Sequence, residues 1–121
     1  MQTIFFLRQN GKFVRINFHE IVYAQSCKNY VRIVTVNQQW MALLPMKDLE
    51  EHLPPSMFCR VHRSYIVSLE HIMAFDHSKV YLKDAALPIG EQFKAAFQGS
   101  VRIVMGESRA KMAISVSGMA C

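Results

Sequence analysis

The chain has 121 residues, 51% of them hydrophobic, and 14 Lys and Arg against 9 Asp and Glu give a net charge of +5. This length fits one domain, and the hydrophobic fraction allows a core that does not need disulfides or a bound metal to stabilise it. The basic excess favours an acidic partner, such as nucleic acid or an anionic surface, and does not choose between them.

The beginning of the chain is predicted to form a β-hairpin. Two apolar runs, residues 3–8 and 12–17, are separated by Asn10 and Gly11, which suit the positive φ angles of a type I′ turn. Apolar and polar residues alternate along the second run. This alternation indicates a sheet with one face in water.

Residues 19–27, 29–36 and 40–44 are predicted to supply the next strands, and the second run is the richest in β-branched and aromatic residues. The pattern then changes. Leu49 and Leu53 lie four residues apart, on one face of a helix, between Pro45 and a Pro pair that would end it. We therefore expect a short helix over about residues 46–53.

The second half is predicted to contain short strands and one more helix. Phe93 and Phe97 lie four residues apart, which favours a helix over about residues 90–98. The succession of predicted strands with only two short helices indicates a mainly β fold. Residues 99–121 show no clear period beyond one short run, and we expect a domain at 1–98 followed by a C-terminal extension at 99–121. The strand candidates are residues 57–62, 68–75, 79–83, 86–89 and 101–105.

The cysteines and motifs exclude several classes of protein. Cys27, Cys59 and Cys121 are widely spaced, with no CxxC pair and no Cys/His zinc pattern, so we expect a reduced cytoplasmic protein with no metal and no cofactor. No signal peptide, apolar membrane span or catalytic motif is present, so we expect neither membrane association nor enzymatic activity. Cys59 and His62 would lie on opposite faces of a strand, which argues against a nucleophile pair.

Two short basic stretches stand out. One is CKNYVR, residues 27–32, at a turn, and the other is FCRVHRSYIV, residues 58–67, on a strand and the turn after it. Asn and Arg can bind base edges and Lys can bind phosphates. A simpler interpretation also holds for each residue, because Lys28 suits a solvated turn, Arg32 the wet face of a sheet, and Ser64 a turn.

Four segments together resemble a LytTR-type DNA-binding domain, over about residues 3–98. They are GKFVRINFHEIVYAQ, KNYVRIVT, LLPMKDLEEHLPPSMFCRVHRSYIVSLEHI and KVYLKDAALPIGEQFKAAF, and FxRVHRSYIV is the most specific part. The resemblance implies an elongated fold of small, mostly antiparallel sheets that binds double-stranded DNA through loops in the major groove. It also implies a transcriptional regulator, either free-standing or the output domain of a response regulator. The implied partners are tandem DNA sites, a second copy of the chain on DNA, and a receiver domain or sensor kinase.

The resemblance also implies three contact loops: the first loop (residues 25–32), the second loop (62–65) and the third loop (89–94). At the start of the third loop the family often has Ser-Arg where this chain has Gly90 and Glu91. The resemblance implies base contacts by Asn29, Gln92 and Arg63. It implies phosphate contacts by Lys28, Arg32, Arg63, Lys94 and Ser64. The implied DNA-binding residues are Lys28, Asn29, Tyr30, Arg32, Arg63, Ser64, Gln92 and Lys94.

His62 is interpreted as a structural residue near the centre of the domain, and Arg60 as mainly structural or phosphate-facing. Two alternatives to duplex binding stay open at this stage. The basic loops could bind an acidic partner protein, as edge strands and grooves of small β domains often do. Single-stranded nucleic acid would instead need exposed aromatic platforms, for which Tyr30 and Tyr65 are the candidates.

Overall fold

The structure is a computed structural model that describes residues 3–105. Its first two strands, β1 (Ile4–Gln9) and β2 (Lys12–Asn17), form a separate antiparallel sheet. Asn10 has φ 51° and Gly11 φ 79°, so the predicted hairpin and its positive-φ turn are confirmed. Phe13 is 67% exposed and Ile16 only 2%, which confirms the expected one-sided exposure.

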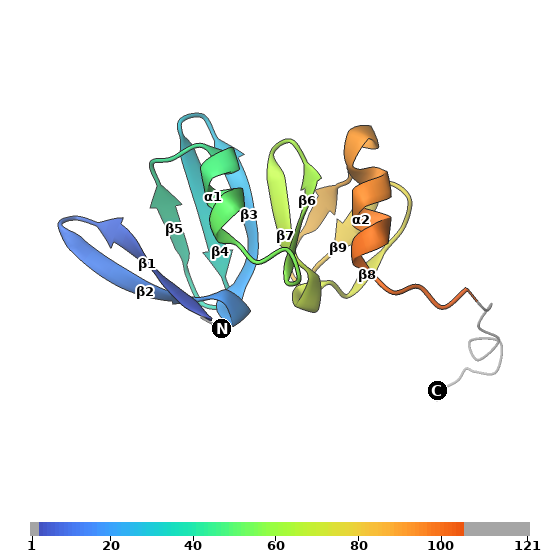
Figure 1. Cartoon of the computed structure of the whole chain (residues 1–121), viewed down its shortest axis with the longest axis horizontal. Coiled ribbons are helices and arrows are strands. Elements are labelled where there is room, and N and C mark those ends of the chain that lie inside the picture. The colour runs from blue at the N-terminus through green and yellow to red at the C-terminus, as the bar shows by residue number, and fades with distance from the viewer. Residues whose placement is uncertain (1–2, 106–121) are drawn as a thin grey trace.

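A five-stranded antiparallel sheet forms the centre of the molecule (Figure 1), in the order β5-β4-β3-β7-β6. A short 3-10 helix, η1 (Phe18–Glu20), leads into it from β2. The order matters for function because it places β7 directly beside β3, although 37 residues separate their ends in the sequence. The five strands are β3 (Ile21–Cys27), β4 (Tyr30–Thr35), β5 (Gln39–Ala42), β6 (Phe58–His62) and β7 (Tyr65–Ser68).

Two helices and a third sheet complete the fold, which confirms the mainly β class. The first predicted helix is α1 (Met46–His52), with Leu49 and Leu53 both buried. The second predicted helix, over about residues 90–98, begins as a 3-10 turn and continues as an α-helix to Ser100, two residues past the expected end. The remaining elements are η2 (Leu69–His71), β8 (Ala74–Phe75), β9 (Lys79–Tyr81), β10 (Ala86–Pro88), η3 (Glu91–Phe93) and α2 (Lys94–Ser100). The third sheet is antiparallel and has the strand order β10-β9-β8.

Two predicted strands are wrong. The run 68–75 is broken by η2, because His71 Nε2 bonds to the carbonyl oxygen of His19 at 2.8 Å and the chain turns there toward the third sheet. The run 101–105 forms no strand, since no neighbouring strand pairs with it. Val101 is half-buried, whereas Ile103, Val104 and Met105 are exposed, with Val104 at 86%.

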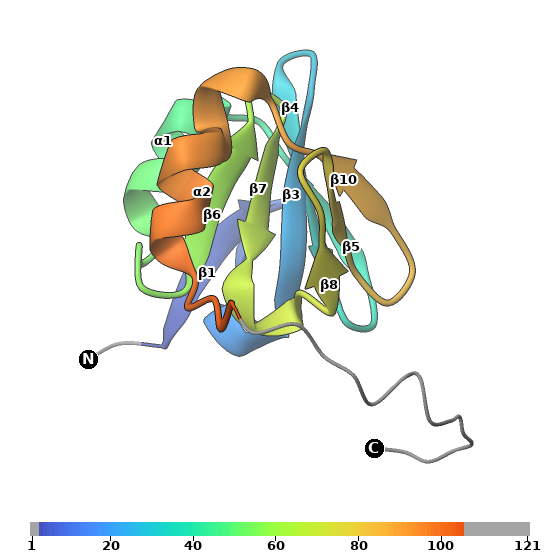
Figure 2. The same ribbon diagram turned by 90° about the vertical axis from the view of Figure 1, so that its right-hand side faces the viewer.

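The central sheet separates two apolar cores. α1 and the β1–β2 hairpin pack on one face, whereas α2 and the third sheet cover the other (Figure 2). β6 and β7 serve both cores: Phe58 and Ile66 belong to the first, and Val61 and Val67 to the second. A loop joined to these two strands therefore rests on a base that is buried on both sides.

Residues 106–121, most of the expected extension, lie outside the described residues, and Cys121 is among them. Cys59 is buried with Val61 in the second core, as its place on the strand predicted, and burial raises the pKa of its thiol. Across residues 3–105 no helix is both long and apolar enough to cross a membrane. The same residues hold no group of three or more His, Cys, Asp and Glu that could bind a metal ion.

Candidate nucleic-acid interface

The three loops implied by the resemblance lie side by side at one end of the central sheet, the upper end in Figure 1. The backbone N–H of Ser26 in the first loop donates to the carbonyl oxygen of Ser64 in the second, at 2.9 Å. The N–H of Gly90 in the third loop donates to the carbonyl oxygen of Val61, just before the second loop, at 2.8 Å. Backbone hydrogen bonds thus align segments that are far apart in the sequence.

The first loop is the tight turn between β3 and β4. Cys27 pairs with Tyr30, so Lys28 and Asn29 form the two-residue tip, and Lys28 has φ 57°. Residues other than glycine rarely adopt this left-handed backbone conformation, and such strain often occurs at functional turns. Lys28, Asn29 and Tyr30 are exposed, and Leu43 of the β5–α1 connection helps to line a shallow hollow beside the tip.

The second loop is held from below by Arg60. Its guanidinium donates from Nε to the carbonyl oxygen of His62 at 3.0 Å and from Nη2 to that of Arg63, and Nη1 pairs with Glu50 at 2.8 Å. His62 Nδ1 accepts the N–H of Ser64 at 3.1 Å. These contacts support the structural interpretation of Arg60 and His62.

Arg63 is the exposed member of the second loop. Within the described residues its side chain has no hydrogen-bond or ion-pair partner, whereas its carbonyl oxygen is held by Arg60. Ser64 is half-buried, and its backbone is bonded on both sides, to Ser26 and to His62. The loop therefore presents one arginine on a fixed backbone.

The third loop packs closely against the second. A small hollow is lined by Arg63 and Gln92 together with their neighbours, and Gln92 is exposed at its edge. A Cβ atom on Gly90 would lie 3.1 Å from the ring of Phe93, so a larger residue would strain this approach. Glu91 pairs with Lys94 at 3.1 Å, and this pair partly neutralises the acidic side chain of the third loop.

Arg32 lies in a polar network on the face of the sheet, below the first loop. Its guanidinium donates to Gln39 at 2.8 Å, to the hydroxyl of Tyr23 at 3.2 Å and to Gln25. Gln25 in turn donates to the hydroxyl of Tyr65 at 3.2 Å. The phosphate contact of Arg32 stays a prediction, and the network gives the residue a second role, as a support that joins the first loop to the second.

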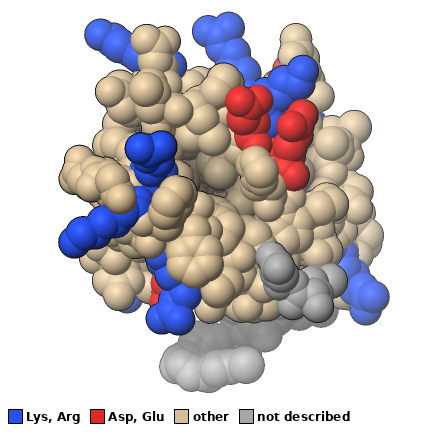
Figure 3. All heavy atoms as spheres, turned by 60° about the vertical axis from the view of Figure 1, so that its left-hand side comes forward, with Lys and Arg blue, Asp and Glu red and all other residues tan. Residues whose placement is uncertain are grey.

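Charged and neutral side chains are mixed on the face of the molecule that Figure 3 shows. On the face that carries β1 and β2, Lys and Arg side chains lie among neutral ones, and acidic side chains lie beside a basic one (Figure 3). A continuous basic patch is therefore not the main feature of this view.

The family model of the LytTr DNA-binding domain matches residues 11–102. The chain belongs to the LytTr DNA-binding domain family. Membership confirms the resemblance and assigns this LytTr domain to the DNA-binding domains of transcriptional regulators. The fold agrees: the LytTr DNA-binding domain of a DNA response regulator from Bacillus cereus superimposes with a TM-score of 0.70 at 19% identity, over 83% of this chain and 97% of the other.

Curated relatives match part of the chain. The CO-responsive transcriptional regulator RcoM of Rhodospirillum rubrum is 40% identical over 55 residues, 46% of this chain and 23% of that protein. The sensory transduction protein LytT of Bacillus anthracis is 36% identical over 59 residues, 49% of this chain and 24% of that one. The LytTr chain thus spans about a quarter of the length of these two relatives.

The sequence analysis missed the residues that support the loops. Gln25 was not singled out, although a two-residue turn at Lys28 and Asn29 places it directly opposite Arg32. Glu50 was not singled out either, yet it pairs with Arg60, ten residues away. The first contact could have been found from the hairpin register, whereas the second depends on how α1 packs against β6.

Proposed function

We propose that this LytTr domain binds double-stranded DNA sequence-specifically, with the first, second and third loops inserted in the major groove. The observation that carries this proposal is the alignment of the three loops by the backbone bonds from Ser26 to Ser64 and from Gly90 to Val61. Contact residues on loops that a rigid sheet positions are a common arrangement in binding proteins. Three exposed polar side chains, Asn29, Arg63 and Gln92, lie along this row.

The residues divide into two roles. Asn29, Gln92 and Arg63 would bind base edges, with Arg63 bidentate to guanine N7 and O6. Phosphate contacts would supply most of the affinity and fix the register of the protein on the duplex. Tyr30 would face the groove beside Asn29. The proposed phosphate contacts are Lys28, Arg32, Arg63, Ser64 and Lys94.

We further propose that the chain acts in transcription as a response-regulator output domain or a free-standing regulator. Two copies would occupy tandem sites, as a homodimer on DNA, and a receiver domain or sensor kinase would control them. The name of RcoM as a transcriptional regulator and that of LytT as a sensory transduction protein support this assignment. The domain boundaries proposed with it are residues 1–98, with 99–121 as an extension.

Chemical protection of a bound duplex tests the groove directly. Dimethyl sulfate methylates guanine N7 in the major groove and adenine N3 in the minor groove, and both atoms are exposed in free duplex. We expect the full chain to protect guanine N7 at positions within its site and to leave adenine N3 reactive. Protection of adenine N3 alone would overturn the major-groove assignment, and binding without any protected base would leave only backbone contacts.

A further inference from the structure

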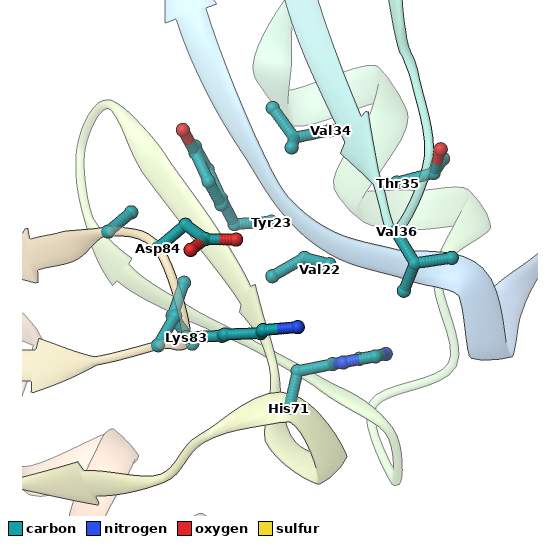
Figure 4. A pocket seen from close by; sticks show the side chains of 10 residues that line it. Val22, Tyr23, Val34, Thr35, Val36, His71, Lys83 and Asp84 are labelled. Atoms are coloured by element: carbon teal, nitrogen blue, oxygen red, sulfur yellow. The ribbon is translucent and has the colours of Figure 1, made fainter.

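A pocket lined by Tyr23 lies between the central sheet and the third sheet (Figure 4). Its volume is about 240 Å³. The walls are mainly apolar and come from β3, from β4 and the residue after it, and from the β9–β10 turn. The lining residues are Val22, Tyr23, Val34, Thr35, Val36, His71, Leu82, Lys83, Asp84 and Ala85.

Two opposite charges stand at this pocket. Lys83 extends alongside Val22, and Asp84 lies beside Tyr23 (Figure 4). Within the described residues neither Lys83 nor Asp84 forms an ion pair or a side-chain hydrogen bond. Asp76, on a nearby turn, shows the contrast, because it accepts bonds from Ser78, Lys79 and Tyr81 to stabilise its own turn. The turn carrying Lys83 and Asp84 therefore does not need their charges for its own hydrogen bonds.

The size of the pocket limits what it can hold. Its volume of about 240 Å³ lies slightly below the usual range for drug-sized ligands, and it equals that of roughly eight waters in the liquid. A nucleotide or a folded peptide segment is too large. A molecule of the size of one free amino acid fits, and the three valines of the wall, Val22, Val34 and Val36, suit an apolar side chain.

We propose that this pocket binds a small zwitterion of the α-amino acid class with a compact apolar side chain. The carboxylate of the ligand pairs with Lys83, and its ammonium group pairs with Asp84. The side chain of the ligand packs against Val22, Val34 and Val36. Both charges are needed, since a simple carboxylate would meet the repulsion of Asp84 and a simple amine that of Lys83.

The pocket is joined to the DNA-contact loops through Tyr23. One side of this residue lines the pocket, while its hydroxyl accepts a bond from Arg32 and its ring lies 6.3 Å from that of Tyr65. Arg32 and Tyr65 both bond to Gln25, beneath the first and second loops. A ligand that shifts Tyr23 therefore changes the affinity for DNA, an effect that rests on the proposed function; an allosteric coupling of this kind is typically about 5-fold or more.

Binding is tested first without DNA, so that its outcome does not depend on the proposed function. The full chain labelled with ¹⁵N is titrated with L-leucine, L-valine and L-phenylalanine, and its amide shifts are recorded. We expect saturable shifts at the pocket amides, with Kd about 1 mM or lower. Leucinol, which lacks the carboxylate, and N-acetyl-leucine, which lacks the ammonium group, should bind about 3- to 10-fold more weakly, as for the loss of one exposed ion pair.

Substitutions at the charged turn complete the test. Lys83→Met and Asp84→Asn should each weaken leucine binding to the same degree, whereas Lys79→Met, at an exposed position on β9 outside the pocket lining, should leave it unchanged. The proposal is overturned if none of the three amino acids gives saturable shifts. It is also overturned if wild type binds leucinol and N-acetyl-leucine as tightly as leucine and the two charge variants bind leucine as tightly as wild type does. That result would show only nonspecific occupancy of an apolar pocket.

The coupling between the pocket and the DNA-contact loops is then measured as the effect of leucine on duplex affinity, for wild type and for Tyr23→Phe. We expect leucine to change the DNA affinity of wild type and to have a smaller effect in the variant, which lacks the hydroxyl bonded to Arg32. Leucine binding without any change in DNA affinity would refute the coupling and retain the pocket. Failure of wild type to bind any duplex specifically would refute the proposed function and leave the pocket result intact.

Discussion

Arg60 donates a hydrogen bond from its guanidinium to the carbonyl oxygen of Arg63, so one arginine holds the backbone of the next exposed one. The side chain of Arg60 is only 20% exposed and also bonds to Glu50 and to the carbonyl oxygen of His62. The planar guanidinium suits this role, since its donors reach three acceptors at fixed angles. The second loop is thereby preorganised before any partner binds.

Replacing Arg60 tests this support. Arg60→Met removes hydrogen bonds to two backbone carbonyls, and we expect the free energy of unfolding to fall by about 1–3 kcal/mol and DNA affinity to fall with it. Urea unfolding and a DNA titration measure the two effects. Glu50→Gln is the matched control: it weakens a partly exposed ion pair and should cost less than about 1 kcal/mol. An Arg60→Met protein with unchanged stability and binding would show that Arg60 supports nothing.

Arg63 and Lys28 should differ in the kind of loss that they cause. Arg63→Ala is expected to cost about 1–3 kcal/mol of binding free energy and to relax specificity at one base pair, because it removes a base contact. Lys28→Ala should weaken binding to all sequences alike and reduce the slope of log K against log salt by about one. Titrations of a set of single-base variants at several salt concentrations separate the two. Equal losses on every sequence for Arg63→Ala would remove it from base recognition.

Gly90 should tolerate even a methyl group poorly. Gly90→Ala puts a Cβ atom 3.1 Å from the Phe93 ring and 3.5 Å from the His62 ring, so the third loop must move relative to the second. We expect weaker DNA binding with a modest loss of stability, of the order of 1 kcal/mol. Gly99→Ala is the control, since nothing lies within 4 Å of a Cβ there. Similar behaviour of the two variants would mean that this close approach has no consequence.

Arg32 is expected to stabilise the fold as well as any complex. Arg32→Gln removes bonds to Gln39, Gln25 and Tyr23, and we expect the free energy of unfolding to fall by about 1–2 kcal/mol. Thermal or urea unfolding measures this without DNA. A stability equal to that of wild type would contradict the supporting role. The salt slope of the same variant tests the phosphate contact, which predicts a decrease of about one.

Asp76 should make the stability of the third sheet depend on pH. Hydrogen bonds from the Ser78 N–H, the Tyr81 hydroxyl and the Lys79 N–H hold the pKa of its carboxyl well below the usual range. Its contribution is therefore complete above the unfolded pKa of about 3.9 and is lost as the pH falls through the lower folded value. Asp76→Ala should have a lower Tm than wild type at neutral pH, and the difference should shrink below about pH 4. A constant difference down to pH 2 would contradict this account.

The parts of the fold that local chemistry determines could be predicted from the sequence. Asn10 and Gly11 suit positive φ angles, and the prolines around 46–53 bound a helix, so neither depends on distant residues. The turn at 69–71 could not be predicted, because it depends on a bond from His71 to His19, 52 residues away. The run 101–105 has the composition of a strand but no partner to pair with.

The candidate site divides in the same way. The composition of each loop was visible in the sequence, and the family resemblance supplied their proposed roles. Their alignment could not be read from the residues alone, since it follows from β7 pairing with β3 across the central sheet. The support of the second loop by Arg60 was foreseen only as a structural role, because its acceptors are backbone carbonyls that appear once β6 bulges before His62.

The most direct test of sequence-specific binding is selection of bound duplexes from a random DNA pool by the full chain at about 150 mM salt. We predict an enriched motif that is repeated about one helical turn apart. Selection with the Arg63→Ala variant should give the same motif with no preference at one of its base pairs. No enrichment, with only weak binding that added salt abolishes, would contradict the account and leave an acidic partner protein as the ligand of these loops.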